Sequence, residues 1–357
     1  MKKIFLQFVL FFWNRSLNTR KLFLPLFRLL LKVFGRKSIF TGIESECHAF
    51  NKELTDELKN DMLSSLILYG SSPKEYFLYG FPKLNAEERD TFLTDHYREQ
   101  VLKREIGIQH FKNELINKYG FYQRNKDFFG RKCILVTSNT QFEDFRDFLK
   151  RADGKIFIKD NRGSFGSDGR VIFYENDEQL LEELKKIQNA GHEWIAEEFI
   201  SQDDRLSCWN KSSVNTIRIP SYLTPEGPTI FRPFIRTGRV GSFVDNAGVG
   251  GIFATINEST GEIITDGADE HGNFYVCHPD SRIVYKGWKV PLWKELLAVA
   301  KNAHLKMPDN KYVAYDFALT SSGWVMVEGN WGQYMCQQTS TRKGQKEGFL
   351  RLMGCNK

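Results

Sequence analysis

The pattern of apolar and polar positions predicts three strands and a helix in the middle of the chain. Residues 155–158 and 171–174 are short apolar runs on either side of a glycine-rich stretch. Residues 176–190 then carry apolar side chains at three- and four-residue spacing among charged ones, which is the periodicity of a helix. Residues 194–200 read as a further strand. The segment therefore predicts two antiparallel strands around the glycine-rich stretch, followed by a helix and a third strand.

The region before this segment is predicted to be helical. Residues 50–69 and 86–119 carry apolar residues at three- and four-residue spacing among many charges. We expect residues 41–118 to form a helical lobe, and residues 119–357 to form a second core. A chain of 357 residues with 41% apolar content is long enough for two or three domains.

Two apolar runs near the end of the chain, residues 315–320 and 324–330, are joined by a short turn and predict a β-hairpin. Alternation along a strand places Glu328 and Asn330 on one face, and the turn can bring Asp316 beside them. Three oxygen ligands would then converge, and oxygen ligands suit magnesium, which is usually met beside a nucleotide. The alternative is a hairpin whose polar residues lie on its solvated face.

The glycine-rich stretch between the first two strands has the composition of a phosphate-binding loop. Gly163, Gly166 and Gly169 allow positive φ and close backbone approach, so successive N–H groups can form an anion nest, and Lys159 adds a charge at its base. Neither the P-loop nor the dinucleotide fingerprint fits, because both require a helix after the glycines and a strand follows here. The alternative is a plain turn.

The order of these features resembles the ATP-grasp superfamily: a lysine, a glycine-rich loop, a strand, a helix, an acidic strand and a metal-binding hairpin. Residues 213–219, 234–239 and 244–252 further resemble the sugar-transfer associated branch of that superfamily, which is found with polysaccharide synthesis. The resemblance covers roughly residues 119–354. It implies an α+β fold of the ATP-grasp type, with two α+β subdomains gripping ATP, preceded by a helical N-terminal region.

The resemblance also implies which residues bind the nucleotide and the metal. The loop would cover the phosphates, the acidic strand would be the hinge over adenine, and one or two magnesium ions, or manganese, would bridge the phosphates. The nucleotide-binding residues would be Lys126, Lys159, Gly163, Ser164, Gly166, Gly169, Glu197, Glu198, Phe199 and Asn215. The metal ligands would be Asp316, Glu328 and Asn330.

Three further residues are candidates for the catalytic site. Arg218 and Arg236 lie in strand-like runs, and a guanidinium fork can bind a phosphoryl group or a substrate carboxylate bidentately. Asn246 resembles part of the segment that lies across the acyl-phosphate site in amide-forming relatives. The alternatives are a structural ion pair for the two arginines, a plain glycine-rich loop for Asn246, and a solvated side chain for Lys126.

Other chemistry has weaker support in the sequence. His271 and His278 lie in a loop-like stretch with several acids, and no fixed ligand spacing marks a zinc site, so we interpret them as loop residues. Serine, cysteine and histidine are scattered without a nucleophile elbow. The six cysteines show no Cys-x-x-Cys spacing and are too sparse for a disulfide scaffold, which favours a reducing cytoplasm.

The function implied by the resemblance is ATP-dependent ligation of a small-molecule carboxylate to an amine through an acyl phosphate. Two alternatives stay open: phosphoryl transfer to a hydroxyl on a sugar or lipid-linked acceptor, and a nucleotide-binding assembly factor with little turnover. The sequence does not identify the acceptor. The choice of ligation rests on fold-level analogy.

Charge is unevenly distributed along the chain. Nine lysines and arginines precede Glu44, the first acid, whereas the remaining 41 basic residues face 44 acidic ones. The apolar runs in residues 1–40 are shorter than a bilayer span and are interrupted by basic residues, so we expect a helix on an anionic membrane surface, on the inner face of the cell membrane. The alternative is that these residues pack on the protein's own core. Nucleic acid is not an expected partner, because the basic residues accompany aliphatic runs.

Overall fold

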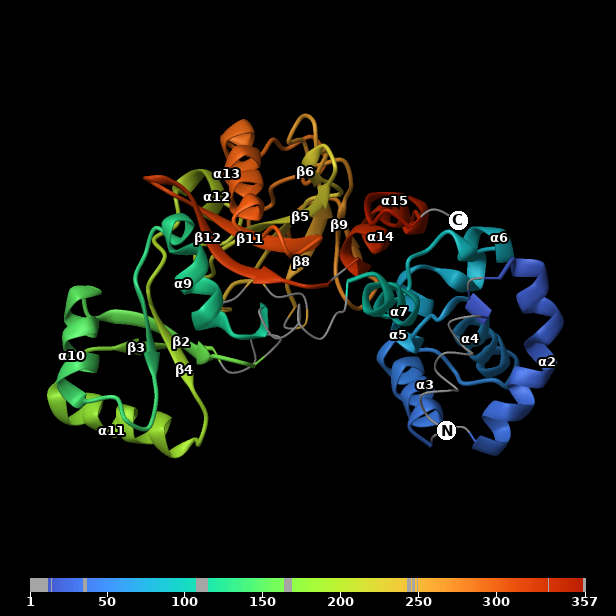
Figure 1. The fold of residues 1–357 in the computed structure, drawn as a ribbon, viewed down its shortest axis with the longest axis horizontal. Coiled ribbons are helices and arrows are strands. Elements are labelled where there is room, and N and C mark those ends of the chain that lie inside the picture. Colours follow the sequence, from blue (N-terminus) through green and yellow to red (C-terminus); the bar gives the residue numbers. More distant parts are fainter. Residues whose placement is uncertain are drawn as a thin grey trace. The chain divides into compact units, whose positions relative to one another are not determined.

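The structure is a computed structural model of the chain (Figure 1). It describes residues 12–13, 15–34, 37–106, 115–163, 169–242, 245, 248, 250–332 and 334–355. The chain divides into two compact units, each of which is built from more than one segment. Unit 1 consists of residues 1–108, 268–274 and 333–357, and unit 2 consists of residues 109–267 and 275–332.

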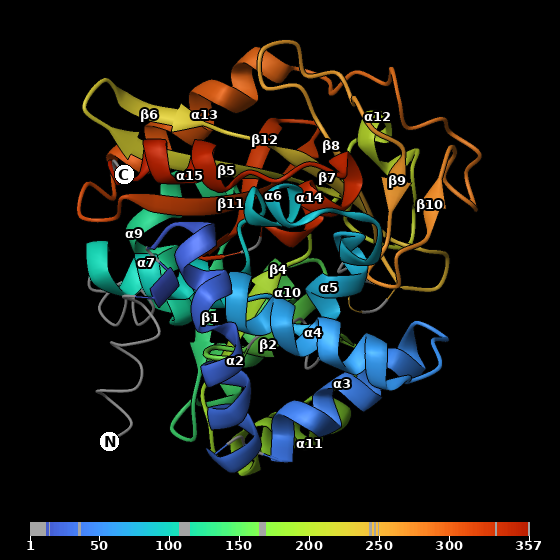
Figure 2. The ribbon, with the colours of Figure 1, turned by 90° about the vertical axis from the view of Figure 1, so that its right-hand side faces the viewer.

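Unit 1 is helical in its described part, and Figure 2 shows several of its helices. Its helices are α2 (Leu17–Phe34), α3 (Lys37–Ala49), α4 (Asp56–Tyr69), α5 (Pro73–Leu78), the 3-10 turn Phe81–Lys83, α6 (Ala86–Asp90), α7 (Asp95–Ile106), α14 (Met335–Thr341) and α15 (Lys346–Leu352). Buried apolar side chains of α3, α4 and α5 form one core with the residues around Phe81. No helix in the described residues has both the length and the apolar character needed to cross a bilayer.

The helices predicted in this region exist, with different bounds. The helix expected over residues 50–69 begins at Asp56, because Thr55 accepts a hydrogen bond from the backbone N–H of Leu58 and so caps the helix. It ends at Gly70, whose φ of 71° is the left-handed conformation of a helix C-cap. Two helices, α6 and α7, occupy the start of the run predicted over residues 86–119.

The C-terminal helices α14 and α15 belong to unit 1. The side chain of Gln338 donates to the backbone carbonyl of Leu93 at 2.9 Å and accepts from the backbone N–H of Leu93 at 2.8 Å. Lys346 and Asp90 form an ion pair at 2.8 Å. These contacts attach the last helices to the helical region at the start of the chain.

Unit 2 contains a four-stranded sheet with strand order β1-β4-β2-β3 and antiparallel pairing throughout. Its strands are β1 (Cys133–Val136), β2 (Lys155–Asp160), β3 (Arg170–Phe173) and β4 (Trp194–Glu198). Helices α10 (Phe142–Arg151) and α11 (Asp177–Asn189) bury their apolar side chains with those of the sheet in one core. The two strands predicted around the glycine-rich stretch and the helix and strand after them are therefore confirmed.

The second sheet of unit 2 has the order β8-β7-β5-β11-β12, with β6 also paired to β5. The elements of this part are α12 (Asp204–Ser207), β5 (Thr216–Thr224), β6 (Gly227–Ile230), β7 (Phe234–Thr237), β8 (Ile252–Thr255), β9 (Gly267–Ala268), β10 (Phe274–Tyr275), α13 (Trp293–Leu305), β11 (Tyr312–Thr320) and β12 (Gly323–Asn330). Residues 312–319 of β11 are all buried. Strands buried on both faces read as continuous apolar runs, so the few polar residues in β5 and β11 have buried partners.

Helix α9 (Lys118–Phe129) packs against β12, and the two elements meet at very short range. A Cβ atom at Gly329 would lie 2.4 Å from the ring of Phe121, so only glycine allows this approach. Gly130, with φ 59°, ends the helix in the left-handed conformation. The first residue of α9, Lys118, is thereby held close to the hairpin.

Candidate active site

The hairpin brings together the three predicted oxygen ligands. Asp316 on β11 lies opposite Glu328 on β12, and the register shifts between Asp316 and Phe317. The side-chain amide of Asn330 donates to Asp316 Oδ2 at 3.1 Å and to Glu328 Oε1 at 3.2 Å. The predicted convergence of these side chains is confirmed, while their role as metal ligands stays a prediction.

Both predicted catalytic arginines bind Asp316. Arg218, which pairs with Asp316 across β5 and β11, donates through Nε to Oδ1 and through Nη2 to Oδ2, both at 2.6 Å. Arg236 on β7 donates through Nη2 to Oδ2 at 2.9 Å. Burial acts to raise the pKa of Asp316, but the charges of the two arginines outweigh it, so the pKa lies below its ordinary value. The ion pair that the sequence left open as an alternative is therefore present.

Asp245 is a buried member of this cluster that sequence reasoning missed. Its carboxylate lies 3.3 Å from Arg236 Nη2 and accepts a hydrogen bond from the Thr216 hydroxyl at 2.5 Å. Burial raises its pKa despite the opposing charge of Arg236. Only its position beside Asn246 could have indicated it, and Asn246 lies outside the described residues.

Lys159, which is partly buried, and Glu197, which is buried, form a charge pair in the first sheet. The ammonium group of Lys159 on β2 lies 2.7 Å from Glu197 on β4, and Arg131 lies 2.5 Å from the same carboxylate. Burial acts to lower the pKa of Lys159, but Glu197 and Glu328 raise it above its ordinary value. Arg131 also donates to the backbone carbonyl of Met326 at 2.6 Å, which ties β12 to this pair.

Lys118 is the second lysine of the site, and sequence reasoning missed it. Its ammonium group donates to the backbone carbonyls of Asp160, at 2.8 Å, and Gly163. Burial and then the charge of Lys159 lower its pKa. A small pocket is lined by Leu115, Lys118, Phe121, Phe129, Lys159, Glu197, Val327, Glu328 and Gly329. The pocket therefore joins the two lysines to a carboxylate of the hairpin.

Lys126 is the lysine of α9 that the sequence resemblance predicts to bind the nucleotide. It lies further along the helix than Lys118 and is exposed. The lysine that lines the pocket is two turns earlier, directly after Asn117, which caps the helix by accepting from the backbone N–H of Gly120. The sequence gives little indication that Lys118 lines the pocket, because Lys118 stands at the boundary between the two predicted regions.

The remaining predicted nucleotide-binding residues lie in different environments. Glu198 accepts from the backbone N–H of Lys132 at 2.8 Å, and the ring of Phe199 lies 3.5 Å from the ammonium group of Lys155. Asn215 is fully buried. Its amide donates to Gln202 and to two backbone carbonyls, and it accepts from a backbone N–H. These hydrogen bonds give Asn215 a structural role. Asn215 does not line the pocket that contains Lys118 and Lys159.

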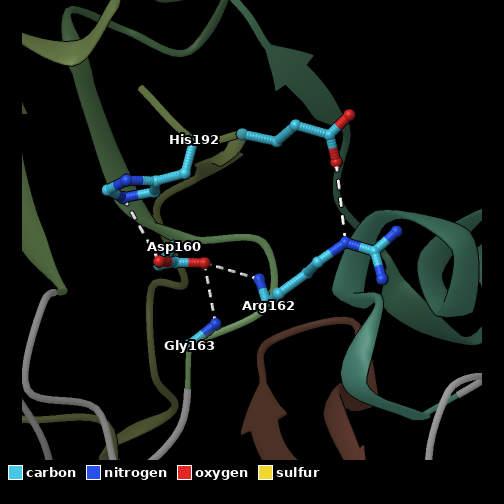
Figure 3. A pocket seen from close by; sticks show the side chains of 5 residues that line it. Asp160, Arg162, Gly163 and His192 are labelled. Atoms are coloured by element: carbon cyan, nitrogen blue, oxygen red, sulfur yellow. Dashed lines mark hydrogen bonds and ion pairs between the residues drawn. The ribbon is translucent and has the colours of Figure 1, made fainter. Parts of the chain in front are cut away.

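The start of the glycine-rich stretch is fixed by Asp160, as Figure 3 shows. Its Oδ1 atom accepts from the backbone N–H groups of Arg162, at 2.6 Å, and Gly163, at 2.7 Å. His192 Nε2 lies 3.2 Å from its other oxygen, and Glu193 completes the lining of this open pocket. Gly169 directly precedes β3, whereas Ser164 and Gly166 lie outside the described residues.

Of the two histidines interpreted as loop residues, His271 lies between β9 and β10, and His278 follows β10. His278 is buried, and its Nε2 atom lies 2.9 Å from the carbonyl of Gly238, while its neighbour in the loop, Asp280, pairs with Arg239. Within the part of the chain that the structure describes, no three His, Cys, Asp or Glu side chains gather as a metal site. The candidate ligands of the hairpin are not such a group, because they are two carboxylates, Asp316 and Glu328, and one amide, Asn330.

The donor chemistry of the hairpin fits magnesium. Carboxylate and amide oxygens are hard ligands, and magnesium completes its shell with water and phosphate oxygens, so a small protein set is sufficient. Asp316 Oδ2 accepts from Arg218, Arg236 and Asn330, and Oδ1 accepts from Arg218 Nε, so a cation would be ligated at Oδ1, where a second lone pair remains. Glu328 is only partly buried, and its contact with Arg218 is long, at 4.0 Å.

The two sheets, the helices on them and the charged residues between them define the class of protein. Unit 2 has the ATP-grasp fold, as the sequence resemblance implied. The sequence profile of the sugar-transfer associated ATP-grasp family matches residues 117–347, and the chain belongs to that family. The chain has no match among curated proteins.

Solved structures with similarity to the chain include three ligases. D-alanyl-alanine synthetase A from Vibrio cholerae is 12% identical with a TM-score of 0.42, over 68% of this chain and 65% of that one. D-alanine–D-alanine ligase from Bacillus anthracis is 10% identical with a TM-score of 0.38, over 60% and 54%. VanG D-Ala:D-Ser ligase from Enterococcus faecalis is 14% identical with a TM-score of 0.42, over 68% and 62%. The chain thus covers less than two thirds of each of these proteins.

Proposed function

We propose that the protein is an ATP-dependent ligase that activates a carboxylate as an acyl phosphate and joins it to an amine, in polysaccharide or glycoconjugate biosynthesis. Family membership supports the use of ATP and the link to sugar transfer. The observation that carries the proposal is the pocket of unit 2, where Lys118 and Lys159 face Glu328. Phosphoryl transfer depends on positioning and on neutralising phosphate oxygens, and the proposal is supported by two cationic groups that line the same pocket as Glu328, the carboxylate proposed as a metal ligand.

The two lysines would bind the phosphate chain. Lys159 is held in place by Glu197, which is itself fixed by Arg131, so its charge is positioned before the nucleotide arrives. Lys118 is anchored to the start of the glycine-rich stretch through its bonds to backbone carbonyls. An ammonium group of lowered pKa remains cationic at neutral pH beside a polyanion, because the phosphates favour the charged form. Both side chains therefore serve binding and orientation.

Asp316, Glu328 and Asn330 would hold one or two magnesium ions, which when bound neutralise the phosphate oxygens. Arg218 and Arg236 fix the position of Asp316. A guanidinium carries five N–H donors, so each arginine can also offer donors to a substrate carboxylate or to the phosphoryl group being transferred. We propose Arg218 and Arg236 for this second role.

The test is product analysis with the purified full chain, ATP, magnesium, and mixtures of amino acids and sugar nucleotides. We expect ADP, phosphate and a product whose mass equals that of a carboxylate plus an amine less one water. Glu328→Gln should lower turnover roughly 100-fold or more, because it removes a charge from the metal set. Glu182→Gln, on the exposed face of α11, is the matched control and should leave turnover unchanged.

Two other results would contradict the ligase. ADP together with an acceptor that gains a phosphoryl mass would identify a kinase. If the protein binds the nucleotide but shows no turnover that Glu328→Gln lowers, the result would identify an assembly factor.

A further inference from the structure

The most exposed apolar surface of unit 1 is on helix α2. Leu22 is 75% exposed, Leu29 58%, Leu26 48% and Phe23 43%. Leu22, Leu26 and Leu29 are spaced by four and three residues, so they form one stripe along the helix. A soluble surface helix normally turns such a stripe toward its core, so this stripe has the opposite orientation.

The opposite face of α2 is firmly attached to the rest of unit 1. Phe27 is buried against Phe12, with ring centroids 4.3 Å apart. Arg20 is 2% exposed, lies 2.6 Å from Asp90, and donates to the backbone carbonyl of Leu68. Leu24 packs against the buried core of α3, α4 and α5. The helix therefore already has a packed face, and the exposed leucines are not a core face left open.

The sequence segment that carries this stripe is basic, although Arg20 pairs with Asp90 and Lys21 with Glu87, at 3.2 Å. Residues 1–43 contain nine lysines and arginines and no acid, whereas the rest of the chain carries a net charge of −3. Lys21, directly beside Leu22, is exposed. Isolated exposed apolar residues elsewhere, such as Val276, do not lie in a basic segment.

We propose that α2 docks the protein on an anionic lipid bilayer, with Leu22, Leu26 and Leu29 at the headgroup boundary and the exposed basic residues Arg15 and Lys21 at the lipid phosphates. The apolar stripe and the basic charge are the two components of an interfacial helix. A second copy of the chain fits less well, because it would bring two basic segments together. The helix carries Arg20, Lys21 and Arg28 within its 18 residues, so it lies on the bilayer and does not span it.

The test is flotation of the full chain with vesicles, in three arms. We expect binding to vesicles of phosphatidylcholine mixed with phosphatidylserine, weak binding to phosphatidylcholine alone, and loss of binding at high salt. The triple variant Leu22→Ser/Leu26→Ser/Leu29→Ser should lower partitioning at least about tenfold, because three apolar side chains no longer enter the boundary. The substituted side chains are exposed, so the fold should be retained, and an unchanged circular dichroism spectrum and melting temperature would confirm this.

The control variant is Val276→Ser/Val284→Ser, which replaces apolar residues that are 64% and 52% exposed in unit 2. It should bind vesicles as the original chain does. Equal binding to both vesicle types, equal loss in the control, or no binding at all would overturn the proposal. A dimer in sedimentation that the triple variant dissociates, together with no vesicle binding, would instead assign the stripe to contact between copies.

Discussion

Asp316 has no exposed surface, and its charge is balanced by Arg218 and Arg236. Replacing Arg218 with methionine keeps much of the side chain's length and removes its charge. We expect the free energy of unfolding of unit 2 to fall by about 3–5 kcal/mol, because the carboxylate would lose its bidentate partner while remaining buried. Urea denaturation followed by circular dichroism measures the change. The control is Arg205→Met, since the pair between Arg205 and Asp203 is exposed and its loss should change little.

The effect of this substitution should depend on pH. The pKa of Asp316 lies below its ordinary value, so the carboxylate contributes stability that is complete above about pH 4 and is lost as the pH falls through the lowered pKa. The Arg218→Met variant lacks most of this contribution. We therefore expect the difference in unfolding free energy between the two proteins to be largest near neutral pH and to shrink in acid. A difference that stays constant from neutral to acid pH would show that Arg218 stabilises the fold by packing alone.

Lys118 and Lys126 lie on the same helix, and only the first lines the pocket. We expect Lys118→Gln to weaken ATP binding about 10- to 100-fold, the range of one charge-assisted hydrogen bond to a phosphate. Lys126→Gln should bind ATP as the original protein does, because Lys126 is exposed and outside the pocket. Isothermal titration calorimetry with a non-hydrolysable ATP analogue measures both. The reverse order of effects would restore Lys126 as the phosphate lysine.

The contact between α9 and β12 positions Lys118 beside the hairpin. Gly329→Ala would place a methyl group 2.4 Å from the ring of Phe121, so the helix must move away from the strand. We expect this variant to lose about 1–3 kcal/mol of stability and to bind ATP more weakly. Gly42→Ala is the matched control, because Gly42 lies within α3 and an added Cβ meets no atom within 4 Å. It should be neutral or stabilising by up to about 1 kcal/mol. Thermal denaturation and analogue binding compare the two, and equal losses would contradict the role of the Phe121 contact.

Elements with strong local signals could be predicted from the sequence. The strands around the glycine-rich stretch, α11 and the hairpin follow from periodicity and turns, and the convergence at Asp316 follows from the hairpin geometry. The partners of Glu197 could not be predicted in the same way, because Arg131 and Glu197 are 66 residues apart and neither lies in a local motif. Asn215 is a different case, since a motif suggested binding and the fold uses the side chain for internal hydrogen bonds.

The chain passes between its units more than once. The sequence predicted one continuous second core over residues 119–357. The structure instead assigns residues 268–274 and 333–357 to unit 1. Distant segments meet there through contacts such as those of Gln338 with Leu93. We expect a protein lacking residues 1–106 to expose the buried face of α14 and to aggregate, because Cys336, Gln337 and Gln338 would lose their surroundings.

The two units should also differ in their response to nucleotide. All residues of the proposed site lie in unit 2, so ATP binding stabilises that unit directly, by about 2.7 kcal/mol at a free concentration of 100 times the dissociation constant. Hydrogen exchange measured by mass spectrometry, with and without a non-hydrolysable analogue and magnesium, locates the effect. We expect protection in peptides from β2, β4 and β12 and no change in α3 and α4. Lys118→Gln should abolish the protection at the same analogue concentration. Equal protection of both units would mean that the nucleotide stabilises the chain as one cooperative body. The two units would then not unfold separately in solution.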